Sequence, residues 1–132
     1  MDAVVHFEMP YDDAERVSAF YSRAFGWQMQ TLGEEMGHYV LATTVESDES
    51  GPTSPGAING GLYARDPEAP PQHPSFVIAV DDIQEAIKAV KEAGGAVLGE
   101  PMMIEGIGLY AAFTDPEGNR LSMLQAVPRQ AE

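Results

Sequence analysis

The sequence contains no cysteine. This absence excludes a disulfide framework, a thiolate metal site and a cysteine nucleophile. No apolar run approaches the ~20 residues that a membrane-spanning helix needs. The first ten residues, MDAVVHFEMP, have neither the basic start nor the extended apolar stretch of a signal peptide. We therefore expect a soluble, cytosolic protein with no membrane partner.

Basic residues are also scarce. Seven Lys and Arg stand against 21 Asp and Glu, which gives a formal net charge of −14. Such a field repels the phosphate backbone of nucleic acids and anionic membranes, so neither is expected as a partner. A neutral or cationic ligand is favoured over an anionic one. At 132 residues the chain has the length of a single domain with one sizeable core.

The chain contains the same pattern twice. A constant shift aligns Asp12-Asp13 with Asp81-Asp82, and in each copy a β-type run leads through the acidic pair into an amphipathic helix. Asp12 and Asp81 have the capping-box spacing to a Glu or Gln three residues later, so we expect them to be the N-caps. Three shorter apolar segments follow each helix. Each half therefore reads as βαβββ.

These halves define the expected domain organisation. We predict one domain over residues 1–132, built from a module at 1–65 and a module at 74–128 with a Pro-rich linker at 66–73. The segment 46–56, ESDESGPTSPG, interrupts the first module. Its composition fits either an ordinary hairpin loop or a lid, and the sequence does not choose between them.

Alternation along the first run assigns the two faces of the sheet. Val5, Phe7 and Met9 lie on one side of a strand, and the amphipathic helix must cover that apolar side. His6 and Glu8 then lie on the opposite side. The corresponding run of the second half places Ser75 and Val77 on that same uncovered side. A face that no helix covers is available to bind something.

The tandem βαβββ pattern, together with DDAERVSAFYSRAFGW and FTDPEGNRL, resembles the vicinal oxygen chelate superfamily of glyoxalases, bleomycin-resistance proteins and extradiol dioxygenases. The resemblance implies an α+β fold in which the two modules form an eight-stranded, cupped, mixed sheet with the helices on its outer face and a pocket inside. It also implies metal ligands on the first strand of each module and on the last strand of one or both. Sheets of this shape leave edges that two-fold pairing covers, so we expect a homodimer.

Only one of those ligand positions carries a ligand residue. His6 matches the first-strand position, whereas its repeat counterpart is Ser75, the last-strand position is Ser122, and module one has Gly60 or Gly61 there. One imidazole with hydroxyls is a poor site for a divalent ion. We therefore expect no metal cofactor. A shifted ion held with the help of Glu8 and His73 is the alternative.

The same face supplies candidates for binding and catalysis. Glu8 is a candidate general base and His6 its proton-holding partner. The INGG stretch, 58–61, is consistent with close approach of a ligand to the backbone or with a strand bulge. The remaining candidate ligand-binding residues are Asn59, Gly61, Tyr63, Ser75, Val77, Tyr110, Ser122 and Leu124.

Three functions remain open at this point. The first is a protein that binds or sequesters a neutral or cationic organic ligand, as in the bleomycin-resistance branch. The second is a glyoxalase-like, metal-dependent lyase or transferase built around His6. The third is a metal-free isomerase or lyase that works through Glu8 and His6.

Overall fold

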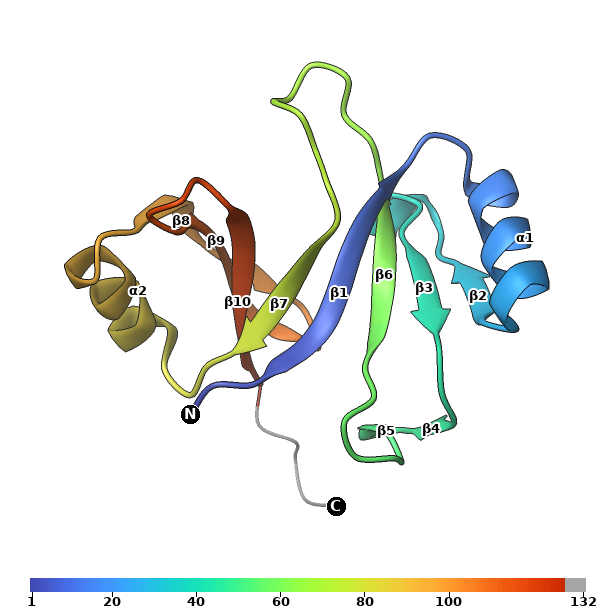
Figure 1. The fold of residues 1–132 in the computed structure, drawn as a ribbon, viewed down its shortest axis with the longest axis horizontal. Coiled ribbons are helices and arrows are strands. Elements are labelled where there is room, and N and C mark those ends of the chain that lie inside the picture. Colours follow the sequence, from blue (N-terminus) through green and yellow to red (C-terminus); the bar gives the residue numbers. More distant parts are fainter. Residues whose placement is uncertain (128–132) are drawn as a thin grey trace. The chain divides into compact units, whose positions relative to one another are not determined.

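The computed structural model describes residues 1–127, so the predicted module end at 128 and the rest of the predicted domain to 132 lie outside the described residues. The chain divides into two compact units. One is His6–Pro74, called here the 6–74 unit. The other combines Met1–Val5 with the chain from Ser75 onward and is called the 75–127 unit (Figure 1).

The 6–74 unit holds four strands of the main sheet in the order β2-β3-β6-β1, with β1 and β6 parallel and the other pairs antiparallel. A short hairpin, β4–β5, forms within the segment 46–56. The elements of this part of the chain are β1 (Val4–Tyr11), α1 (Ala14–Phe25), β2 (Gln28–Thr31), the 3-10 helix η1 (Glu34–Met36), β3 (Val40–Thr43), β4 (Ser47–Asp48), β5 (Gly51–Pro52) and β6 (Asn59–Ala64).

The 75–127 unit repeats this arrangement with the strand order β7-β10-β9-β8, in which β7 and β10 are parallel. The amide of Ala79 donates a hydrogen bond to the carbonyl of Ala3 (2.9 Å), which ties the first residues to this unit. Its elements are β7 (Ser75–Ala79), α2 (Ile83–Glu92), β8 (Ala96–Ile104), β9 (Gly108–Thr114) and β10 (Arg120–Ala126).

The predicted fold class is confirmed: eight of the strands belong to one mixed sheet, and two α-helices accompany them in an α+β fold. Neither helix, within residues 1–127, has both the length and the apolar character to cross a membrane.

The core of the 6–74 unit lies between its strands and α1. Tyr11, Val40, Ala42 and Leu62 are buried, and Phe7, Met9 and Val17 pack against them. The predicted helix-facing side of the first strand is therefore confirmed for Phe7 and Met9. Since neighbours along a strand alternate, His6 and Glu8 lie on the opposite face.

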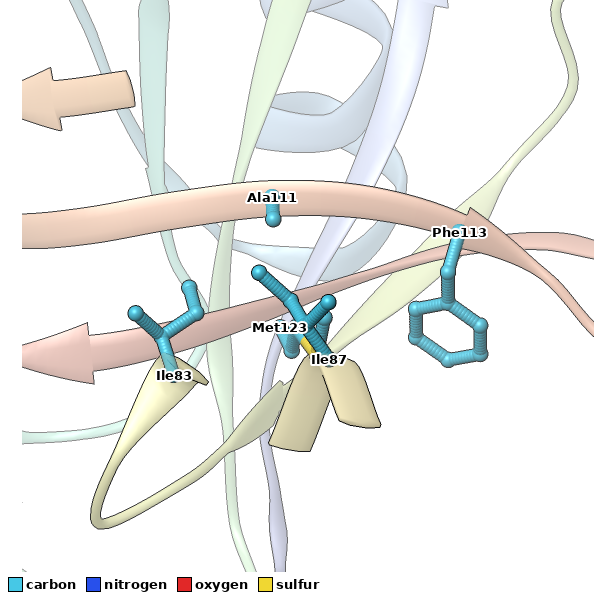
Figure 2. Close-up of a cluster of buried hydrophobic side chains, with 5 residues drawn as sticks. All are labelled: Ile83, Ile87, Ala111, Phe113 and Met123. Atoms are coloured by element: carbon cyan, nitrogen blue, oxygen red, sulfur yellow. The ribbon is translucent and has the colours of Figure 1, made fainter. Parts of the chain in front are cut away.

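The core of the 75–127 unit is built in the same way. Figure 2 shows Ile83 and Ile87 of α2 beside Ala111 and Phe113 of β9 and Met123 of β10. Odd-numbered residues of β9 and β10 thus face the helix, and their even-numbered neighbours face away from it.

The predicted helix N-caps are wrong by one residue. Asp13 and Asp82, not Asp12 and Asp81, have the extended backbone of an N-cap, and their side chains accept hydrogen bonds from amides of the first helical turn. Asp12 instead accepts a hydrogen bond from the guanidinium of Arg65 (3.0 Å), a residue brought close only by the fold.

Candidate functional site

His6 and Glu8 lie on the face of the 6–74 unit that α1 does not cover, called here the uncovered face. In the parallel ladder between β1 and β6, His6 is paired with Asn59 and Glu8 with Gly61. The side chains of paired residues lie on the same face of a sheet. The strand register therefore brings together four of the predicted site residues.

A fifth residue, Tyr39, connects the two ionisable groups. Its hydroxyl donates a hydrogen bond to Oε2 of Glu8 at 3.3 Å and lies 3.2 Å from Nε2 of His6. Because the phenol proton goes to the carboxylate, the bond to His6 requires the imidazole to donate from Nε2. The result is a chain of hydrogen bonds from imidazole through phenol to carboxylate.

The turn before β3 positions Tyr39. Gly37 and His38 both adopt left-handed backbone (φ 65° and 57°), and the amide of His38 donates to the carbonyl of Gly33. The carbonyl of His38 accepts from the hydroxyl of Tyr11 (2.7 Å), which fixes the turn against the buried end of β1. Tyr39 is not among the site residues that the sequence predicts.

Two adjacent glycines make room for two rings. A Cβ added at Gly61 would overlap the phenol of Tyr39, and one added at Gly60 would overlap the ring of Phe7 on the opposite face of β6. The register between β1 and β6 runs without a break from Asn59 to Ala64. A strand bulge in the INGG stretch is therefore excluded, and the lack of side chains there serves aromatic packing.

Asn59 is engaged with its own loop. Its Oδ1 accepts a hydrogen bond from the amide of Thr44 (2.9 Å), and its Nδ2 donates to Oγ of Ser47 (2.8 Å). These bonds tie the base of the segment 46–56 to β6. Tyr63 lies farther along the same face of β6, half-buried.

Burial lowers the pKa of the His6 imidazole below its ordinary value near 6.5, and the negative charge of Glu8 only partly offsets this effect. Desolvation disfavours the charged form of a histidine. His6 is consequently a neutral imidazole at neutral pH, which agrees with the role of a single N–H donor toward Tyr39.

This shift predicts a pH dependence of stability. The unfolded chain takes up a proton at His6 below about pH 6.5, whereas the folded chain resists it until its lower pKa is reached. The contribution of His6 to the free energy of unfolding is thus fully present above pH ~6.5 and is lost as the pH falls below that value. Thermal unfolding from about pH 7.5 to about pH 5 should show a smaller acid-induced loss for His6→Gln than for the wild type.

Because acidification also relieves the repulsion among carboxylates in both proteins, the relevant quantity is the difference between the two curves. Parallel curves would contradict the burial of a neutral His6.

The other predicted residues lie in the 75–127 unit, on the face away from α2. Ser122 is paired with Val77 on β7, and Leu124 with Tyr110 on β9. The Ser122 side chain is buried, and its hydroxyl is hydrogen-bonded to that of Tyr110. Ser75 begins β7 on the same side as Val77.

The ladders also match the two halves residue by residue. Gly61 is paired with Glu8, and Ser122 with Val77, the counterpart of Glu8 in the repeat. Gly61 rather than Gly60 is therefore the counterpart of Ser122. On the neighbouring strands, Leu41 is paired with Gly61 and Ala112 with Ser122, so Leu41 and Ala112 are counterparts. Tyr39 and Tyr110, each two residues before these, are therefore counterparts as well.

The donor set does not fit a divalent metal. Within residues 1–127, the structure groups no three His, Cys, Asp or Glu side chains in a way that could hold a metal ion. The nitrogen of His6 and an oxygen of Glu8 are both bound to the Tyr39 hydroxyl. Glycine and serine at the other family positions offer no imidazole or carboxylate.

A separate hollow of about 480 Å³ runs along α1. Phe20 and Phe25 of the helix are 56% and 64% exposed. The hollow contains none of the predicted site residues. It is lined by Arg16, Ala19, Phe20, Arg23 and Ala24.

Comparison with known proteins gives consistent results. The family model described as "Glyoxalase/Bleomycin resistance protein/Dioxygenase superfamily" matches residues 3–123. A glyoxylase-like domain-containing protein of Didymella fabae is 32% identical over 85% of this chain and 84% of its own length. A probable lactoylglutathione lyase of Vibrio cholerae is 29% identical over 92% and 89%.

Among solved structures, a methylmalonyl-CoA epimerase superposes with a TM-score of 0.69 over 95% of each chain, at 17% sequence identity. At that identity the likeness concerns the fold.

Proposed function

Since the chain belongs to the Glyoxalase/Bleomycin resistance protein/Dioxygenase superfamily, we propose that it binds a small neutral or cationic organic ligand without a metal cofactor. The observation that carries the proposal is the Tyr39 hydroxyl held between His6 and Glu8 on the uncovered face of the 6–74 unit. Phenol, imidazole and carboxylate are there fixed by the fold before any ligand arrives, which lowers the entropic cost of binding.

The charge of the site defines the ligand class. Glu8 is half-buried and is the acidic member of the hydrogen-bonded chain, while His6 is neutral. The whole chain adds a strongly negative field. An ammonium or guanidinium group, or a neutral group that donates hydrogen bonds, is thus favoured over a carboxylate or phosphate.

A metal-free site is part of the proposal. The family resemblance implies a divalent ion, but the residues at the implied positions are His6, Gly61, Ser75 and Ser122. The ion would lack the ligands needed to offset its desolvation. The glyoxalase-like, metal-dependent lyase considered from the sequence is accordingly not the favoured function.

A thermal-shift screen tests ligand binding. Probes should include cationic glycopeptide antibiotics of the bleomycin class, glutathione thiol adducts and neutral aromatic compounds, each over a concentration series. A ligand at 100 times its Kd stabilises the folded state by about 2.7 kcal/mol. The proposal expects stabilisation by a cationic or neutral probe. Stabilisation by anionic probes alone would contradict it.

For a cationic ligand found in this way, Glu8→Gln is expected to weaken binding about 10- to 100-fold, because a charge-assisted hydrogen bond is replaced by a neutral one. Glu35→Gln, a change of the same type at an exposed residue of η1, is the matched control and should leave the Kd nearly unchanged. Isothermal titration calorimetry measures both. Equal Kd values for wild type and Glu8→Gln would show that Glu8 does not contribute to ligand binding.

A second candidate function is a metal-free isomerase or lyase, and the neutral state of His6 favours it. A neutral imidazole linked through a phenol to a carboxylate can accept a proton and share the resulting charge. If the bound ligand is turned over, Glu8→Gln should abolish turnover even at ligand concentrations that saturate its weakened binding. Turnover that is unchanged in both Glu8→Gln and His6→Gln would rule this function out.

We also propose that the protein is a cytosolic homodimer. The absence of cysteine agrees with a reducing compartment. The exposed Phe20 and Phe25 of α1 supply apolar surface that pairing would cover. Light scattering of the purified chain distinguishes a dimer from a monomer.

A further inference from the structure

We propose that Tyr39 and Gly61 act as a pair that blocks a latent divalent-cation site in the 6–74 unit, and that replacing both residues opens it. The opened site would consist of His6, Glu8 and a carboxylate at position 61. This inference rests on the metal-free part of the proposed function and adds its structural cause.

The first step is the position of the phenol. The Tyr39 hydroxyl lies 3.2 Å from Nε2 of His6 and 3.3 Å from Oε2 of Glu8. Zinc binds such nitrogen and oxygen atoms at about 2 Å. An ion that bound both donor atoms would replace the hydrogen bonds that each of them makes with the phenol oxygen. Binding therefore requires the Tyr39 hydroxyl to give up both bonds.

The second step is the missing third ligand. Position 61 is the neighbour of Glu8 on the adjacent strand, on the same face. It is also the counterpart of Ser122, which matches the last-strand ligand position that the family resemblance implies. A carboxylate side chain there would complete a three-ligand set with His6 and Glu8, which are two residues apart on one strand.

The third step is steric. A Cβ at position 61 would overlap the Oη, Cζ and Cε2 atoms of Tyr39. A ligand residue at 61 and the Tyr39 ring in its present position therefore cannot coexist. Gly60 provides an internal comparison, because a Cβ there meets Phe7 on the opposite face and not Tyr39.

The test is a set of zinc titrations by isothermal calorimetry on purified, chelator-free chains. We expect the double variant Tyr39→Ala/Gly61→Glu to bind one zinc ion per chain at least ~100-fold more tightly than the wild type, equivalent to about 2.7 kcal/mol. Tyr39→Ala/Gly61→Leu is the matched control, since it fills the same space without a donor. Adding His6→Ala to the zinc-binding variant should abolish binding.

Unfolding measurements keep the proposal testable if the double variant does not fold. Gly61→Ala should lower the Tm by about 5 °C or more in the wild-type background but by only about 1 °C in the Tyr39→Ala background. Gly60→Ala should lower the Tm equally in both, because Phe7 remains. Equal losses for Gly61→Ala in the two backgrounds would refute the pairing.

The outcomes separate the two proposals. A folded double variant that binds zinc no better than wild type overturns this inference alone. One zinc ion per wild-type chain overturns both this inference and the metal-free part of the proposed function. Failure of every organic probe in the thermal-shift screen affects only the proposed function.

Discussion

Ile83→Ala is expected to lower the free energy of unfolding by about 2–5 kcal/mol. Ile83 has no exposed surface and begins α2, where it packs against the strand side chains Ala111, Phe113 and Met123 (Figure 2). Truncation removes buried methyl groups and leaves a cavity that this contact between helix and sheet cannot fully close. Urea unfolding followed by circular dichroism gives the value.

The matched control is Ile107→Ala. Ile107 is the same residue type in the same unit, but its side chain is 45% exposed in the turn between β8 and β9. Its replacement should cost well under about 1 kcal/mol. Similar losses for the two variants would mean that α2 does not pack on the sheet as described.

Gly60→Ala is expected to destabilise the chain by about 1–3 kcal/mol or more, because the added methyl group enters the space of the Phe7 ring. The Phe7 ring cannot move out of this space easily. Its ring centroid is 5.5 Å from that of Trp27, which in turn stacks on Tyr21 at 4.7 Å. The overlap therefore spreads through an aromatic cluster between β1 and α1.

Chemical denaturation of Gly60→Ala and of Phe7→Leu/Gly60→Ala checks this explanation. The smaller leucine should relieve the overlap, so the second variant should lose less stability than the two single changes together. Strictly additive losses would show that the methyl group at 60 and the ring of Phe7 do not compete for space.

Much of the fold follows from local patterns. The repeated acidic pair, the helical stripes and the alternation of apolar residues in the first strand are each properties of a few neighbouring residues, and they predicted the βαβββ halves and the faces of Phe7 and Met9. The helix caps show where prediction from local patterns ends. Asp12 and Asp13 are equally good caps by type, and the contact that engages Asp12 comes from Arg65, far along the chain.

The same limit of local patterns explains why only part of the site was predicted. Alternation on one strand placed His6 and Glu8 on the uncovered face. Tyr39 was missed because its role depends on a turn with two left-handed residues and on the pairing of β3 with β6 over Gly61. A glycine in a strand signals that something lies close to the backbone, but only the register identifies the neighbour as this tyrosine.

In the proposed function, the Tyr39 hydroxyl, and not a metal ion, joins His6 to Glu8. Metal analysis by mass spectrometry tests it most directly, on wild-type chain purified without chelator, incubated with an excess of zinc, nickel and manganese, and passed through a desalting column. The desalted protein should retain far less than one ion per chain. Retention of one ion per chain in the wild type, lost in His6→Ala, would contradict the metal-free part of the proposed function.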